Sequence, residues 1–133
     1  MPDAVHQRLL GTLQELRRIP DVIAVALARR DGLLISHVLP KNMDPKRIAA
    51  MAAAIVGTSE MAASEMGLGS FFQSIVDSGH AKMLATGAGE EGILITIVRT
   101  DANMGLVLLS VGKAVQAITD ILDQAPDSPE AIA

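Results

Sequence analysis

The feature that most constrains the fold of this chain is residues 44–67, DPKRIAAMAAAIVGTSEMAASEMG, which carry the start and stop signals of one long helix. Asp44 can cap the helix because its carboxylate accepts hydrogen bonds from the free N–H groups of the first turn. Pro45 occupies the first helical position, where its missing N–H costs nothing, and Gly67 is a natural stop. The sequence therefore predicts an unbroken helix over this stretch.

This helix is apolar almost all round when its residues are placed at about 100° intervals. A bulky face is formed by Ile48, Met51, Ala52, Ile55, Ala62 and Met66. A small-residue face on the opposite side is formed by Ala50, Ala53, Ala54, Gly57 and Met61. A helix with two apolar faces must bury each of them against another structural element. We predict that the bulky face packs on a sheet, and that a second copy of this short chain covers the small-residue face.

The length of 133 residues is typical of a single domain, which we place at residues 1–124, followed by a flexible tail at 125–133. A net charge of −4 and only two aromatic residues argue against nucleic-acid binding. The absence of cysteine excludes disulfides and thiolate metal sites. We find no signal peptide and no apolar run near the roughly 18 residues of a membrane span, so we expect a soluble cytoplasmic protein.

The remaining periodicities predict helices and short strands around the long helix. We expect a first helix over 3–18, strands over 22–28, 33–38, 71–77, 80–86 and 93–98, and a last helix over 101–124. Residues 105–111 alone could be a strand, but a helical period runs through the whole last segment. There we expect Gly105 and Gly112 to allow close packing on the sheet. The order predicts an α+β fold: a five-stranded antiparallel sheet, with run 93–98 central, the two terminal helices on one face and the long helix on the other.

The residue types that catalysis needs do not form a recognisable pattern. The sequence lacks a phosphate-binding loop of the G-x-x-x-x-G-K-[ST] type and a G-x-S-x-G nucleophile elbow. His6, His37 and His80 are isolated from one another. We therefore predict no catalytic residues, no metal site and no cofactor.

The order of these segments resembles the roadblock family of dynein light-chain type, most closely its prokaryotic members. The resemblance rests on IPDVIAVALARRDGLLIS, then the Ala/Met-rich helix ending in MGLG, then ILITIV followed by DANMGLVLL. It covers residues 5–124. One departure is Asp21, where family members often carry Gly. The resemblance implies an α-β-β-α-β-β-β-α fold, which agrees with the pattern above.

The resemblance also implies a homodimer in which the long helix packs against its mate and the edge strand, here 71–77, pairs across the two-fold axis. Arg47 and Glu65 flank the small-residue face and would approach each other if two copies of the helix pack antiparallel. The predicted interface comprises Arg47, Ala50, Ala53, Ala54, Gly57, Met61, Glu65, Phe71, Phe72, Gln73, Ser74 and Ile75.

Family members usually perform no chemistry and serve as dimeric platforms for small Ras-like GTPases. The first functional hypothesis is therefore a non-catalytic homodimer that binds and regulates a small Ras-like GTPase. A second is a GTPase-activating protein, for which Arg29 and Arg30 in the first hairpin are candidate contributors, although a charged turn explains them more simply. A third is a small-ligand sensor, which would need a polar-lined pocket that nothing in the sequence marks.

Overall fold

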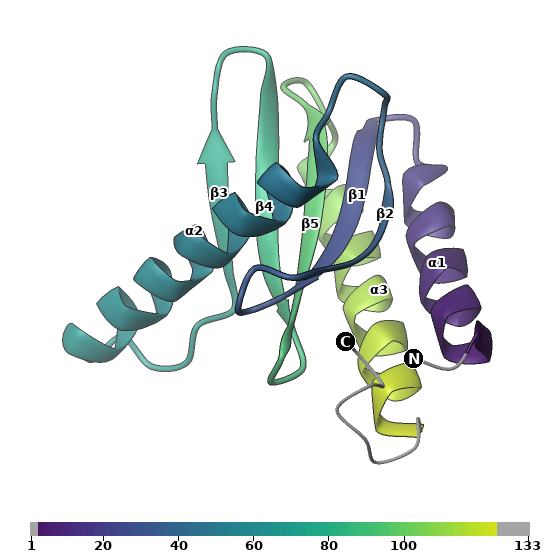
Figure 1. The fold of residues 1–133 in the computed structure, drawn as a ribbon. Helices are drawn as coiled ribbons and strands as arrows, with labels where there is room; N and C mark the ends of the chain where they lie inside the picture. Colours follow the sequence, from purple (N-terminus) through teal and green to yellow (C-terminus); the bar gives the residue numbers. More distant parts are fainter. Residues whose placement is uncertain (1–2, 125–133) are drawn as a thin grey trace.

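A computed structural model describes residues 3–124 of the chain, so the predicted tail at 125–133 lies outside the described residues. Three helices and five strands follow the predicted order (Figure 1). Their bounds are α1 Asp3–Arg17, β1 Val22–Arg29, β2 Leu34–Val38, α2 Pro45–Glu65, β3 Gln73–Asp77, β4 Ala81–Ala88, β5 Gly92–Arg99 and α3 Met104–Gln124.

The five strands form one antiparallel sheet in the order β2-β1-β5-β4-β3. β5 is central, as its run of β-branched residues and leucine predicted, and nearly all of it is buried. β3 is an edge strand, and four of its five residues are exposed. The predicted edge at 71–77 is therefore confirmed, although the strand itself begins at Gln73.

The two faces of the sheet carry separate cores. On one face, leucines and valines of β1, β4 and β5 pack against α1 and α3, with Leu9, Leu13 and Ile118 fully buried. On the other face, Ala26, Ala28, Ala85, Ile93 and Ile95 of the strands pack against α2. Figure 1 shows α2 crossing the sheet on the side opposite α1 and α3. The predicted fold class is confirmed.

The predicted orientation of α2 is wrong in part. Its residues buried against the sheet are Ala49, Ala52 and Val56, whereas Met51, Ala62 and Met66 of the bulky face are exposed. Small side chains on the inner side let the helix backbone lie close to the sheet. A Cβ added at Gly32, in the β1–β2 turn, would lie 3.6 Å from Ala50 Cα. In a helix apolar on every side, periodicity alone cannot identify the side that packs inward.

α3 begins at Met104, three residues after the predicted start at 101, and packs against α1 and the sheet. Asn103 caps it, since its Oδ1 accepts from Leu106 N at 3.2 Å. Asp21 Oδ2 accepts from Asn103 N at 3.0 Å and so ties the start of α3 to the α1–β1 turn. Gly105 and Gly112 face outward, so the prediction that they allow close packing on the sheet is wrong.

α3 has the length and mean hydropathy, 1.5, of a helix that could cross a membrane, in contrast to the sequence expectation of no such segment. Polar residues such as Lys113 and Gln116 interrupt its apolar run, so the sequence shows no continuous apolar stretch of membrane-spanning length. Its apolar side is used inside the protein: Val107, Val111 and Ile118 are buried against α1 and the sheet. Only 28% of its apolar window is buried, however, and Leu106, Leu108 and Leu109 of the same helix are exposed.

Candidate functional site

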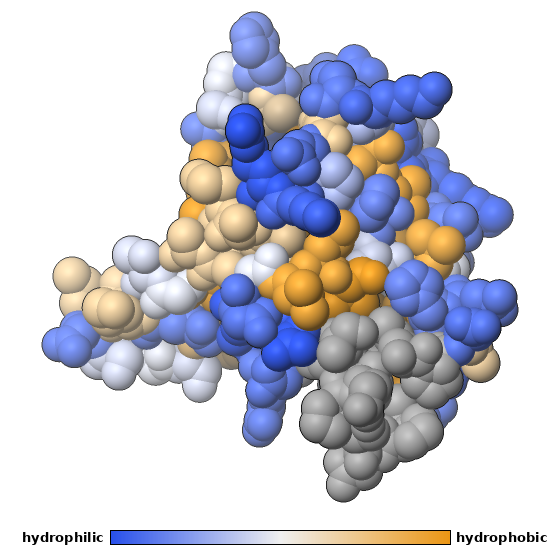
Figure 2. All heavy atoms as spheres, in the orientation of Figure 1, coloured by the Kyte–Doolittle hydropathy of each residue, from blue (hydrophilic) through white to orange (hydrophobic). Residues whose placement is uncertain are grey.

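Large apolar side chains lie exposed on α2, on β3 and in the loop between them, and we call them the α2–β3 surface. They are between 42% and 79% exposed. The set consists of Met51, Met61, Met66, Leu68, Phe72, Ile75 and Val76. Figure 2 shows apolar residues gathered over α2 on this face of the molecule. Exposed apolar residues that cluster, in contrast to scattered ones, mark a site of interaction.

Local structure at the end of α2 joins the helix to the edge strand. Gly67 has a φ of 66°, which lets the chain reverse, while Met66 N and Leu68 N donate to Ala62 O and Ala63 O. Further along, Ser59 Oγ of α2 and Ser74 Oγ of β3 are hydrogen-bonded at 2.6 Å. The helix and the edge strand are therefore joined at this point.

Most of the predicted interface residues are available at the surface. Nine of the twelve are exposed: Arg47, Ala50, Ala54, Gly57, Met61, Glu65, Phe72, Gln73 and Ile75. The other three are partly buried. Ala53 and Phe71 pack against the α2 core, and Ser74 bonds to Ser59. Four further large apolar residues that the predicted interface leaves out are also exposed: Met51, Met66, Leu68 and Val76.

The charged residues at the two ends of α2 interact unfavourably with the dipole of the helix. Lys46 and Arg47 stand in its first turn, which has no acidic residue, and Glu65 ends its last turn, which has no basic residue. A cation at the N-terminus or an anion at the C-terminus of a helix is unfavourable by about 0.3–1 kcal/mol. The Asp44 carboxylate offsets part of this at the start, where it accepts from Lys46 N at 3.0 Å.

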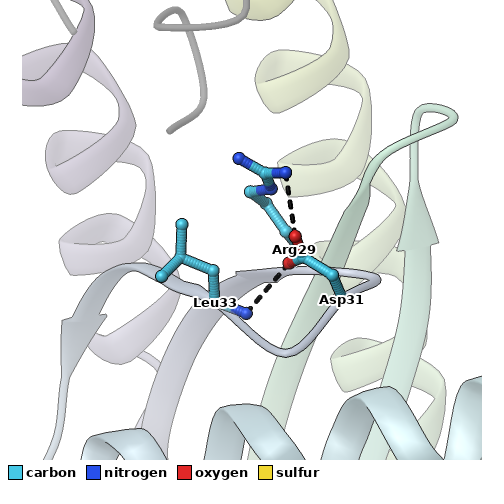
Figure 3. A network of polar contacts seen from close by, with 3 residues as sticks. All are labelled: Arg29, Asp31 and Leu33. Atoms are coloured by element: carbon cyan, nitrogen blue, oxygen red, sulfur yellow. Dashed lines mark hydrogen bonds and ion pairs between the residues drawn. The ribbon is translucent and has the colours of Figure 1, made fainter.

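The two arginines of the first hairpin are both engaged inside the protein. Arg29 Nη2 lies 2.8 Å from Asp31 Oδ2, and Asp31 Oδ1 accepts from Leu33 N at 3.1 Å, which closes the turn (Figure 3). Arg30 Nη1 donates to Gly89 O at 2.9 Å and to Glu90 O in the β4–β5 hairpin. Arg30 Nε lies 3.4 Å from Glu60 Oε1 of α2. These contacts give both side chains a structural role.

A shallow hollow of about 470 Å³ lies beside the end of α2 and is wide open to solvent. Glu60, Ala63, Ser64, Gly67, Gly69, Ser70 and Phe71 line it. Its one charged group, Glu60, is already paired with Arg30. An open hollow of this kind lacks the enclosure of a small-molecule site. Within residues 3–124, no group of three acidic or histidine side chains is placed to hold a metal ion.

Comparisons with known proteins agree with this geometry. The Roadblock/LC7 domain family model matches residues 9–98. An uncharacterized protein of Methanocaldococcus jannaschii, MJ0714, is 36% identical over 114 residues, which cover 86% of this chain and 96% of that protein. The structure of Myxococcus xanthus MglB is similar with a TM-score of 0.84 at 23% identity, covering 89% of this chain and 97% of MglB. The structure of a Roadblock/LC7 domain from Streptomyces avermitilis is similar with a TM-score of 0.81 at 19% identity. The match covers 86% of this chain and 98% of that domain.

Proposed function

On the premise that this chain belongs to the Roadblock/LC7 domain family, as its residue pattern predicted, we propose that it is a cytoplasmic homodimer that binds and regulates a small Ras-like GTPase. The observation that carries the dimer is the α2–β3 surface. Seven large apolar side chains on α2, on β3 and in the loop between them are left uncovered by residues 3–124. The GTPase as partner follows from the family resemblance.

A two-fold contact through this surface resolves two problems together. An unpaired edge strand can add strands from other molecules without limit, and pairing β3 with its own copy closes that edge. The same contact covers the exposed methionines of α2, because Ser59 and Ser74 hold the helix beside the strand. Methionine is flexible and polarizable, and it adapts well to a contact surface.

The module acts, in this proposal, without chemistry of its own. An activator that inserts an arginine into the active site of its partner needs a free guanidinium. Here Arg29 is held by Asp31, and Arg30 is held by two carbonyls and Glu60. The engaged state of both arginines favours a binding platform over an arginine-finger activator. An activator that works by positioning the partner's own groups requires no such arginine.

The dimer is tested by the solution mass of the wild type and two variants in light scattering. We expect the wild type at twice the chain mass of 13.9 kDa. Phe72→Glu places a charge on the α2–β3 surface and should give monomers, since Phe72 is 79% exposed within one chain and its loss leaves the fold intact. Leu109→Glu makes the same kind of change at an exposed position of α3 and should stay dimeric. A monomeric wild type would refute the dimer.

The partner is tested with purified Ras-like GTPases of the source organism, loaded with GDP or with a non-hydrolysable GTP analogue. Calorimetry should detect binding of one nucleotide state in preference to the other, and the rate of GTP hydrolysis with and without this protein measures regulation. If none of these GTPases binds in either state, the proposed function is wrong even if the dimer exists.

A further inference from the structure

We infer that the small Ras-like GTPase docks on one basic end of this molecule, and that the face of the GTPase that meets it is acidic. This inference rests on the proposed function, and it adds where the partner binds and which chemistry recognises it. The basic end comes from the end of α1, the β2–α2 loop and the first turn of α2. It consists of the side chains of Arg17, Arg18, Lys41, Lys46 and Arg47.

The fold brings these separate segments to one end of the sheet. α1 ends at Arg17 and leads into β1, and β2 runs antiparallel to β1, so the end of β2 lies beside the start of β1. Figure 1 shows the α1–β1 turn and the β2–α2 loop at the same end of the sheet. The start of α3 lies there as well, since Asp21 in the turn accepts from Asn103 N at 3.0 Å.

The cations of the basic end have no anionic partner within residues 3–124. None of the five forms an ion pair there. Four of them are exposed, and Arg17 is partly buried. The carboxylates of the two neighbouring loops bind backbone groups instead, because Asp44 accepts from Lys46 N and Asp21 accepts from Asn103 N. The positive charge of this end is thus left uncompensated by the described part of the chain.

This local charge is opposite in sign to that of the rest of the molecule. Five cations and three acidic residues, Glu15, Asp21 and Asp44, give the basic end a net charge of +2. The remainder of residues 3–124 holds six cations and ten acidic residues, a net charge of −4. Charge of one sign gathered on one surface speeds association with a partner of opposite sign and orients that partner. A protein with an acidic face is therefore drawn to this end.

A protein fits the basic end better than an anionic membrane does. The net charge of −4 on the whole chain opposes approach to an extended anionic surface, whereas an acidic patch on a protein can match the basic end in size. A protein interface also needs an apolar contact inside its polar rim. Leu106 offers one at this end, because it is 46% exposed and its N–H bonds to Asn103 Oδ1 at the start of α3.

The test uses the GTPase that binds in the calorimetric assay and measures its association rate by stopped flow at low and at high salt. Lys41→Glu and Lys46→Glu should each slow association about fivefold at low salt. The difference from the wild type should vanish at high salt, and the dissociation rate should change much less. Lys113→Glu makes the same charge change at an exposed position of α3 and should leave the association rate unchanged. Lys41→Arg keeps the charge and should associate like the wild type.

A second readout separates docking from folding and from dimerisation. Lys41 lies in a loop, and an anion at position 46 is favoured by the dipole of α2. Both positions lie outside the predicted dimer interface. The melting temperature and the solution mass of both variants should therefore match those of the wild type. Slower association together with a lower melting temperature would give the lysine a structural role and overturn the inference.

The outcomes distinguish this inference from the proposed function. A GTPase that associates with the wild type, Lys41→Glu and Lys46→Glu at one rate overturns the basic end as the docking surface and keeps the proposed function. If no GTPase binds, both are overturned. Binding of the wild type to vesicles of phosphatidylserine and phosphatidylcholine that Lys41→Glu abolishes would assign this end to a membrane and overturn the inference. Slower association of both lysine variants, with Lys113→Glu unchanged, supports it.

Discussion

The side chain of Arg30 joins three parts of the fold, so its removal tests how the first hairpin is held. Its guanidinium donates to Gly89 O and Glu90 O in the β4–β5 hairpin and lies 3.4 Å from a Glu60 oxygen on α2. Its backbone N also donates to Glu91 O at 2.9 Å, a bond that survives any side-chain substitution. Arg30→Ala therefore removes the three side-chain contacts and leaves the strands paired.

The expected loss of unfolding free energy follows from those contacts. A hydrogen bond to a charged group contributes about 1.5–3 kcal/mol when it is shielded from water. The Arg30 side chain is 26% exposed, so water can partly replace the lost donors at the two carbonyls. The ion pair with Glu60 adds at most about 1 kcal/mol, because Glu60 is 40% exposed. Together these values predict a loss of about 2 kcal/mol for Arg30→Ala.

Lysine should recover only part of this stability. It keeps the charge near Glu60, but a single ammonium cannot reproduce the planar fork that reaches two neighbouring carbonyls. We expect Arg30→Lys to lose about 1 kcal/mol, roughly half the effect of alanine. The difference in unfolding free energy between the wild type and Arg30→Lys measures the geometry of the guanidinium. The difference between Arg30→Lys and Arg30→Ala measures its charge.

The assay is urea unfolding followed by circular dichroism at one fixed protein concentration, since dimerisation makes the midpoint depend on concentration. With a slope near 2 kcal/mol per molar urea, Arg30→Ala should lower the midpoint by about 1 M. The matched control is Arg18→Ala, because Arg18 is exposed and makes no side-chain bond within residues 3–124. If Arg30→Ala and Arg18→Ala shift the midpoint equally, the structural role assigned to Arg30 is refuted.

Two further changes probe polar groups, one in an exposed turn and one in the core. Asp21→Ala removes the acceptor at Asn103 N and should cost about 1–2 kcal/mol in urea unfolding. An unchanged midpoint would show that the turn holds α3 without that bond. Thr96→Val should instead stabilise the protein by about 1 kcal/mol, because the Thr96 hydroxyl is fully buried without a hydrogen-bond partner and valine has nearly the same shape. A lower melting temperature for Thr96→Val would indicate that the hydroxyl is bonded, for instance to a buried water.

The sequence was most informative where one residue type has one structural use. Asp44, Pro45 and Gly67 defined α2 to within two residues. The run 93–98 predicted a central strand because five large apolar residues and a single threonine in six positions are typical of a strand covered on both faces. These features are local, so they could be read without knowledge of the rest of the fold.

The sequence was least informative where the outcome depends on packing between distant segments. The inward side of α2 was assigned wrongly because both sides are apolar, and the side that packs inward is set by contacts with the strands. The contacts of Arg30 with residues 89 and 90 could not be foreseen either, since they join positions 59 and 60 residues apart. The role of Asp21 was missed because its partner, Asn103, is 82 residues away.

The corrected orientation of α2 strengthens the case for a partner. The residues of α2 buried on the sheet are two alanines and a valine, Ala49, Ala52 and Val56, while Met51, Met61 and Met66 lie outside. A helix that served only the fold of one chain would do the reverse, because burial of a large apolar side chain contributes about 1.5–3 kcal/mol and burial of alanine much less. The exposed methionines therefore contribute little burial free energy to the fold of a single chain. The hydrogen bond between Ser59 and Ser74 joins this helix to the open sheet edge, and residues 3–124 leave the large apolar side chains of both exposed.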